Sequence, residues 1–72
     1  MSMGAAATFL AKPQRLTARE QDTARLVMLG LPDKEIARTL QISTTTVRTH
    51  LENAFRKVGV SNRAALVHKL RA

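Results

Sequence analysis

The residues best suited to chemistry lie in one stretch, from Ser43 to Lys57. If this stretch is a helix of about 3.6 residues per turn, its side chains separate into two stripes. One stripe is apolar and suited to burial: Val47, Leu51, Ala54, Phe55 and Val58. The other carries short hydroxyls and long charged groups: Thr45, Arg48, Thr49, Glu52 and Arg56. Such groups can reach base edges and phosphates, so the stretch is typical of a helix that reads DNA.

The composition argues against catalytic and metal-binding chemistry. The chain has no Cys, which excludes disulfides and thiolate metal sites, and its two histidines, His50 and His68, are too few for a His-only site. With 72 residues, it is also too short to surround a convergent set of acid, base and nucleophile. We therefore expect no enzyme, no cofactor, no metal and no small-molecule ligand in this domain.

The charge balance points to an anionic partner. The formal net charge is +7, and from Ser43 onward Glu52 is the only acid among six basic residues. Such an excess attracts polyanions through counterion release, but charge alone does not separate DNA from RNA, an anionic membrane or an acidic protein. The chain has no apolar run of about 18 residues and no signal-peptide pattern. We therefore expect no membrane association and a cytoplasmic protein.

One domain is expected from the length of the chain. Residues 1–15 contain Gly4, several alanines and Pro13, and we predict a flexible tail or interdomain linker there. Residues 16–72 form the predicted domain, which has an all-α fold. A core this small is expected to be mostly helix packed on helix.

Start and stop signals place four helices in this domain. Thr17 and Glu20 form a capping-box pattern at the start of the first helix, and Gly30 marks its end. Pro32, which suits a first helical position, opens the second helix, and Ser43 caps the third. Residues 62–70 form the fourth helix, and the residues predicted to face inward are Ala65, Leu66 and Leu70. The second and third helices, joined by a three-to-four-residue turn, form a helix-turn-helix whose third helix is the recognition helix.

Several motifs in this order and spacing resemble the LuxR-type (GerE-type) helix-turn-helix domain of bacterial transcriptional regulators. The resemblance covers roughly residues 16–70, and the segments that carry it are Leu16-Thr17-x-Arg19-Glu20, Gly30-Leu31, Lys34-Glu35-Ile36-Ala37, Ile42-Ser43, Thr46-Val47-Arg48-Thr49-His50-Leu51 and Lys57-Val58-Gly59-Val60-x-Asn62-Arg63. It implies a four-helix DNA-binding domain that usually ends a larger protein. It also implies a homodimer on paired half-sites, with the fourth helix at the dimer contact, and a location at the bacterial nucleoid. Because the fourth helix offers little apolar surface, we expect the homodimer to form only on DNA.

Three positions depart from the pattern of this family. Thr23 and Ala24 stand where large aliphatic residues are usual, which predicts looser packing of the first helix. Pro32 replaces the usual Ser or Thr cap of the second helix. Glu52 stands where some members carry a basic residue, so the base read at this position is left open.

The candidate site residues are assigned to three kinds of contact. Base contacts are assigned to Arg48, Thr49 and Glu52. Phosphate contacts are assigned to residues near the helix ends: Lys34, Thr44, Thr45, Thr46, Arg56 and Lys57. The two lysines in this list are supported by the resemblance. The dimer contact is assigned to residues of the fourth helix outside its inward stripe: Ala64, Val67, His68 and Arg71.

Several of these roles have alternatives. Arg48 could contact phosphate or only solvent, and Thr49 could touch a thymine methyl or a phosphate. Glu52 could accept from cytosine N4, but an intrahelical ion pair with Arg48 or Arg56 is favoured. His50 is expected to be structural, although the resemblance places it near the DNA backbone. The expected role of Glu20 is also structural, in the capping box and in an ion pair with Arg63.

Two other functions remain open at this stage. A sigma-factor region-4-like promoter-binding module shares the Glu-Ile-Ala, Ile-Ser and Thr-Val-Arg segments and would contact RNA polymerase. A basic helical protein–protein adaptor would use the same exposed stripe to bind an acidic partner, without preference between DNA sequences.

Overall fold

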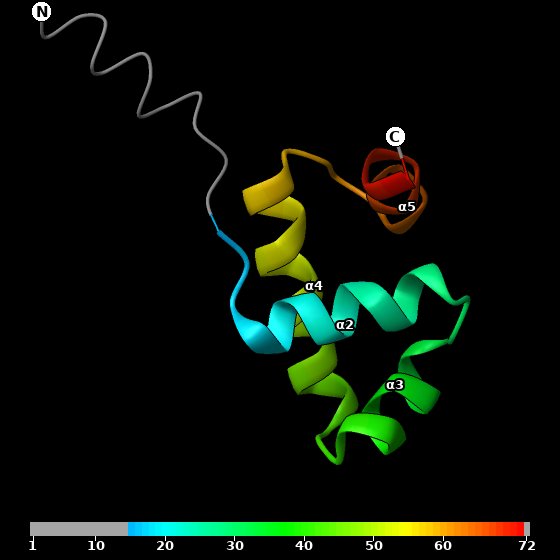
Figure 1. Cartoon of the computed structure of the whole chain (residues 1–72). Coiled ribbons are helices and arrows are strands. Elements are labelled where there is room, and N and C mark those ends of the chain that lie inside the picture. The colour runs from blue at the N-terminus through cyan, green and yellow to red at the C-terminus, as the bar shows by residue number, and fades with distance from the viewer. Residues whose placement is uncertain (1–14, 72) are drawn as a thin grey trace, which may run out of the picture.

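The computed structural model describes residues 15–71, which form four helices and no strand. In chain order they are α2 (Ala18–Met28), α3 (Asp33–Leu40), α4 (Thr44–Val58) and α5 (Arg63–Arg71), as Figure 1 shows. The predicted all-α fold is confirmed. No helix among these residues is long and apolar enough to cross a bilayer. The tail or linker predicted for residues 1–15 lies, apart from Arg15, outside the described residues.

Side-chain caps start two of the helices as predicted. At α2, the Thr17 hydroxyl accepts from the Glu20 backbone N–H at 3.1 Å, and the Glu20 carboxylate accepts from the Thr17 N–H at 3.0 Å. At α4, the Ser43 hydroxyl accepts from the Thr46 N–H at 3.0 Å. The prediction that Pro32 is the first helical residue of α3 was wrong by one position, because it is the extended N-cap residue, whereas the prediction that it stands in place of a Ser or Thr cap is confirmed. It has no side-chain donor or acceptor, so this helix starts without a side-chain cap.

The first three helices end in the same way. In each, a residue just past the helix adopts the left-handed conformation, directly after α3 and α4 and one residue later, after Leu29, for α2; the next N–H then bonds back to the carbonyl five residues earlier. These bonds are Leu31 to Leu26, Ile42 to Ala37 and Val60 to Phe55, with lengths of 2.9–3.1 Å. Gly30 and Gly59 provide two of the left-handed residues, but Gln41 provides the third with φ 59°. Gln41 thus forms the tight turn between α3 and α4 at a backbone cost that a glycine would avoid.

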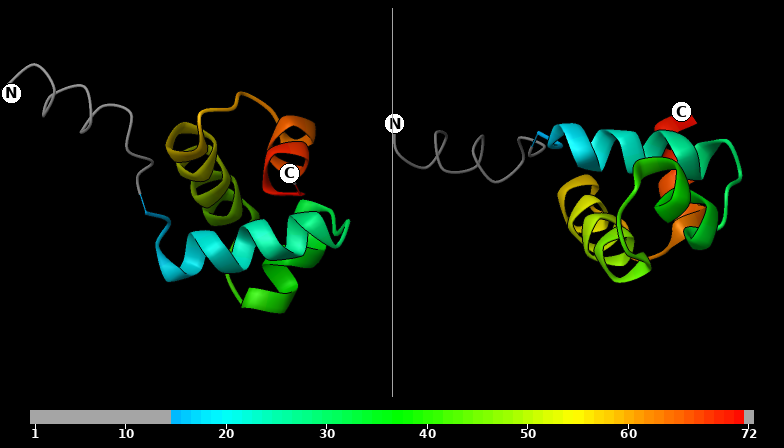
Figure 2. Two further views of the ribbon diagram at one scale, coloured as in Figure 1. Left: turned by 45° about the horizontal axis from the view of Figure 1, so that its top comes forward. Right: turned by 90° about the horizontal axis from the view of Figure 1, so that it is seen from below.

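The core lies where α2 crosses α4 and where α3 and α5 pack beside them (Figures 1 and 2). Ile36, Val47 and Leu66 expose no surface. Thr23 and Ala24 are buried in α2, and the Thr23 hydroxyl donates to the Arg19 carbonyl at 2.8 Å, so burial of this polar group is compensated. The prediction that Leu70 faces inward was wrong: 37% of this residue is exposed.

Candidate nucleic-acid interface

The two faces predicted for α4 are present in the structure. Val47, Leu51 and Ala54 are buried in the core, and Phe55 and Val58 are partly buried against it. The opposite side of the helix carries only exposed polar residues: Thr44, Thr45, Arg48, Thr49, Glu52 and Arg56. We call these six residues the polar stripe. Because burial of one side fixes the orientation of the helix, the polar stripe faces outward as a single surface.

At the start of α4, capping separates the three threonines into two kinds. Thr46 is half-buried, and both its N–H and its hydroxyl lie within 3.0 Å of the Ser43 hydroxyl. Its polar groups are therefore used by the cap. Thr44 and Thr45 are exposed in the first turn, where backbone N–H groups have no intrahelical partner. These two residues are the better placed to donate to an anion.

The orientation of Thr49 bears on which part of a DNA duplex it could contact. Its hydroxyl donates to the Thr45 carbonyl at 3.1 Å. The donor that a phosphate oxygen would require is therefore already used within the helix. The side chain is exposed, and its methyl group is the part that remains for an apolar contact.

Arg48, whose side chain is 71% exposed, meets an acid from another helix and not one from its own. Its guanidinium lies 3.9 Å from the Asp33 carboxylate at the start of α3. Among residues 15–71, Glu52 forms no ion pair, so the intrahelical pairing favoured for Glu52 with Arg48 or Arg56 was wrong. The carboxylate of Glu52 remains exposed on the polar stripe.

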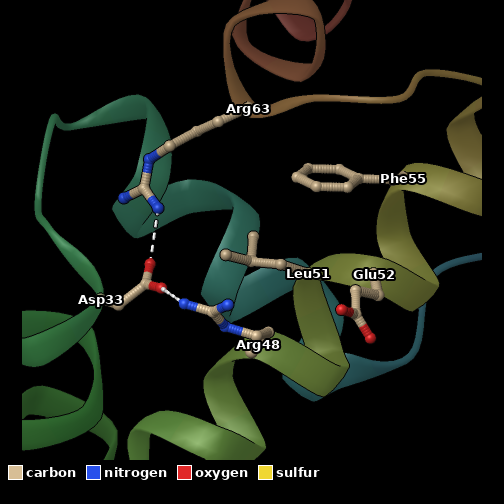
Figure 3. A pocket seen from close by; sticks show the side chains of 6 residues that line it. All are labelled: Asp33, Arg48, Leu51, Glu52, Phe55 and Arg63. Carbon is tan, nitrogen blue, oxygen red and sulfur yellow. Dashed lines mark hydrogen bonds and ion pairs between the residues drawn. The ribbon is translucent and has the colours of Figure 1, made fainter.

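Asp33 also binds Arg63 at the start of α5 (Figure 3). One Asp33 oxygen accepts from the Arg63 guanidinium at 2.6 Å, and the same guanidinium donates to the Leu31 carbonyl. An open depression of about 220 Å³ lies beside this group and is lined by Asp33, Arg48, Leu51, Glu52, Phe55 and Arg63. The predicted pair between Arg63 and Glu20 was therefore wrong.

The partner of Glu20 is Lys57, near the end of α4. Their charged atoms lie 2.7 Å apart, and the side chains are 5% and 16% exposed, respectively. Burial raises the pKa of Glu20, but the hydrogen bond from Lys57, those from Thr17 and the positive charge of Lys57 together hold the pKa below its usual value. Lys57, predicted to contact phosphate, thus has its ammonium group directed to a carboxylate inside the protein. Lys34 and Arg56 are exposed.

The predicted dimer residues of α5 do not form one uniform surface. Ala64, His68 and Arg71 are exposed, whereas Val67 is partly buried against the core of its own chain. The Arg71 guanidinium donates to the Met28 carbonyl of α2 at 3.4 Å. The helix contains no acid, and Lys69 adds another exposed positive charge. His50, expected to be structural, is half-buried in α4.

The sequence is similar to a family of bacterial regulatory proteins. Residues 14–70 match the family model described as bacterial regulatory proteins, luxR family. The chain is 47% identical over 57 residues to the monoamine regulon transcriptional regulator of Klebsiella aerogenes, covering 79% of this chain and 25% of that protein. It is 46% identical over 52 residues to the CsgBAC operon transcriptional regulatory protein of Escherichia coli K12, covering 72% of this chain and 24% of that protein.

A solved structure shows the same arrangement of helices. The response regulator StyR superimposes with a TM-score of 0.73 at 34% sequence identity, covering 97% of this chain and 33% of StyR. The chain therefore spans a quarter to a third of the length of these similar proteins.

Proposed function

Because the chain belongs to the luxR family of bacterial regulatory proteins, we propose that it is the sequence-specific DNA-binding domain of a transcriptional regulator. In this proposal α3 and α4 form the helix-turn-helix, and α4 enters the major groove of duplex DNA. The observation that carries it is the polar stripe of α4, which is exposed along the helix while the opposite side is buried. The full regulator would act on chromosomal DNA in the bacterial cytoplasm.

Phosphate contacts would hold α4 in the groove. Thr44 and Thr45 offer backbone N–H groups and hydroxyls at the helix start, and the positive end of the helix dipole favours an anion there. Lys34 and Arg56 are exposed cations at the start of α3 and in the second half of α4. Thr46 and Lys57 complete the proposed set with weaker support, since the first is engaged by Ser43 and the second by Glu20.

Base contacts would come from the centre of the polar stripe. Arg48 can donate two hydrogen bonds to guanine O6 and N7. Thr49 would present its methyl group to a thymine methyl, because its hydroxyl already donates within the helix. Glu52, which has no ion-pair partner in the part of the chain that the structure describes, could accept from cytosine N4.

We propose that two copies bind paired half-sites and that the second copy joins only on DNA. Ala64, Val67, His68 and Arg71 remain the proposed contact residues of α5. Two copies of this helix would bring like charges together, because α5 contains no acid. Phosphates between the two copies would reduce this repulsion, so association on DNA is favoured over association in solution. A contact with RNA polymerase is a further proposal that a binding assay with the core enzyme would test.

The test is selection of bound duplexes from a random library at two salt concentrations. We expect an enriched motif, with two inverted half-sites about one DNA turn apart. Arg48→Ala should relax the preference at one base position by about 1–3 kcal/mol. Arg25→Ala is the matched control, because Arg25 is exposed on the side of α2 opposite its buried residues. Salt-sensitive binding without an enriched motif would refute sequence-specific recognition and would support a basic adaptor instead.

A further inference from the structure

Asp33 links Arg48, the proposed base-reading residue, to Arg63 of α5. It lies at the start of α3, and its two carboxylate oxygens face two different arginines (Figure 3). One oxygen lies 2.6 Å from Arg63 of α5 and the other lies 3.9 Å from Arg48 of α4. Three helices therefore meet at a single carboxylate on the edge of the polar stripe.

The pair between Arg63 and Asp33 has a fixed position. Arg63 donates both to Asp33 and to the Leu31 carbonyl, so its guanidinium is held at two points. The Asp33 side chain is 29% exposed, compared with 71% for Arg48. The carboxylate therefore has a defined position before any ligand binds, whereas Arg48 projects from it into solvent.

The ion pair between Asp33 and Arg48 bears on how Arg48 would approach a base. A free arginine side chain has many rotamers, and immobilising it on binding costs conformational entropy. An anion fixed on one side of the guanidinium restricts these rotamers. The other N–H groups of the planar guanidinium are still available for a bidentate contact. The structure shows such an anion at one terminal nitrogen of Arg48.

We propose that Asp33 is a specificity-determining residue that positions Arg48 for base readout. It acts through Arg48 and does not itself touch DNA. This inference rests on the proposed function, in which Arg48 reads a base. It extends that function because a residue of α3, held by α5, sets the discrimination made by α4.

The experiment compares Asp33→Asn with Asp22→Asn in the whole chain. Asparagine at position 33 keeps an oxygen that accepts from Arg63 but removes the charge that attracts Arg48. Asp22 is the matched control, because this acid lies on α2 and pairs with Arg19 and Arg25. Each variant is used in duplex selection, and affinity is then measured for the best site and for the same site with the Arg48-dependent base pair changed. Thermal unfolding checks that both variants are folded.

We expect Asp33→Asn to reduce discrimination at the Arg48-dependent base pair by about two- to fivefold, the range of an exposed ion pair. It should have no effect at that base pair when Arg48 is already alanine. Without DNA, the NMR order parameter of the Arg48 Nε–H should fall in Asp33→Asn and stay unchanged in Asp22→Asn. Neither result is expected if Asp33 only stabilises the fold.

Three outcomes would overturn the inference. One is unchanged discrimination in Asp33→Asn while the wild-type chain selects a clear motif. Another is an equal loss with and without Arg48, which would show that the two residues act independently. A third is equally tighter binding to every sequence, which would mean that Asp33 only repels phosphate. If the wild-type chain selects no motif at all, the proposed function fails first, and this inference fails with it.

Discussion

Replacing Lys57 with methionine should destabilise the domain by about 2 kcal/mol, within the range measured for hydrogen bonds to charged groups. Methionine retains much of the length of the lysine side chain but removes the cation that lies 2.7 Å from Glu20. Glu20, whose side chain is 5% exposed, would keep its bond from the Thr17 N–H and lose its only ion-pair partner among residues 15–71. A buried carboxylate without a compensating charge is costly, which gives the predicted sign.

The pH dependence of stability should identify the carboxylate as the cause. In the wild-type chain the pKa of Glu20 is lowered on folding, so its ionised carboxylate stabilises the folded state. This contribution to the free energy of unfolding is fully present above the unfolded pKa of about 4.3 and is lost as the pH falls through the lower, folded pKa. In Lys57→Met, burial still raises the pKa of Glu20, and two of the influences that lower it are gone. The loss of stability in acid should therefore be smaller in the variant than in the wild-type chain.

The assay is thermal and urea unfolding between pH 3 and pH 7, followed by circular dichroism. For a domain of this size, a loss of about 2 kcal/mol corresponds to a fall of roughly 10 °C in Tm. Arg56→Met is the matched control, since it removes the neighbouring cation from an exposed position and should change stability by no more than about 0.5 kcal/mol. Equal unfolding of the two variants, or identical acid profiles for Lys57→Met and the wild-type chain, would refute the reasoning.

Three further predictions concern the interface and the turn before it. Arg56→Ala should reduce the slope of log affinity against log salt by about one unit without changing base preference, as titration at several salt concentrations would show; a changed motif would contradict a pure phosphate contact. Thr49→Ser should lose the preference for thymine at one position, by about 0.8 kcal/mol for the missing methyl group, while Thr49→Val keeps it; the reverse order in a selection experiment would indicate readout by the hydroxyl. Gln41→Gly should raise the free energy of unfolding by about 0.5–1 kcal/mol, because the gain from relieving the left-handed backbone at φ 59° exceeds the loss from the greater conformational freedom of glycine in the unfolded chain. A decrease in the free energy of unfolding, measured in urea, would instead show that the glutamine side chain stabilises the turn.

Local sequence patterns were sufficient to predict the helices and the two faces of α4. The capping box at Thr17 and Glu20, the Ser43 cap and the stop at Gly30 each depend on residues within one turn of the chain. The same is true of the alternation between buried and exposed residues in α4, which follows from helical period alone. The left-handed Gln41 was not predicted, because only glycine and asparagine give a clear signal for that conformation.

Partner choice between distant charges could not be predicted in this way. The sequence predicts a pair between Glu20 and Arg63, whereas in the structure Glu20 pairs with Lys57 and Arg63 pairs with Asp33. The bonded residues are 37 and 30 positions apart. Any of these cations could satisfy either acid by charge alone. What decides between them is the crossing of α2 over α4 and the packing of α5 against α2 and α4, and neither arrangement is encoded in a local pattern.

These internal pairs also change what the number of cations means for DNA binding. The chain has 12 Lys and Arg residues, but Lys57 is paired with Glu20, and Arg63, whose side chain is 38% exposed, is paired with Asp33. Counterion release depends on cations that can come near phosphates, so Lys57 and Arg63 should each contribute less to the salt dependence than an exposed cation does. Lys34 on α3 and Arg56 on α4 remain exposed for that purpose, whereas Lys69 and Arg71 lie on α5. The salt slope of one domain should therefore be smaller than its 12 cations imply, because Lys57 and Arg63 are held by carboxylates that link α4 and α5 to the rest of the fold.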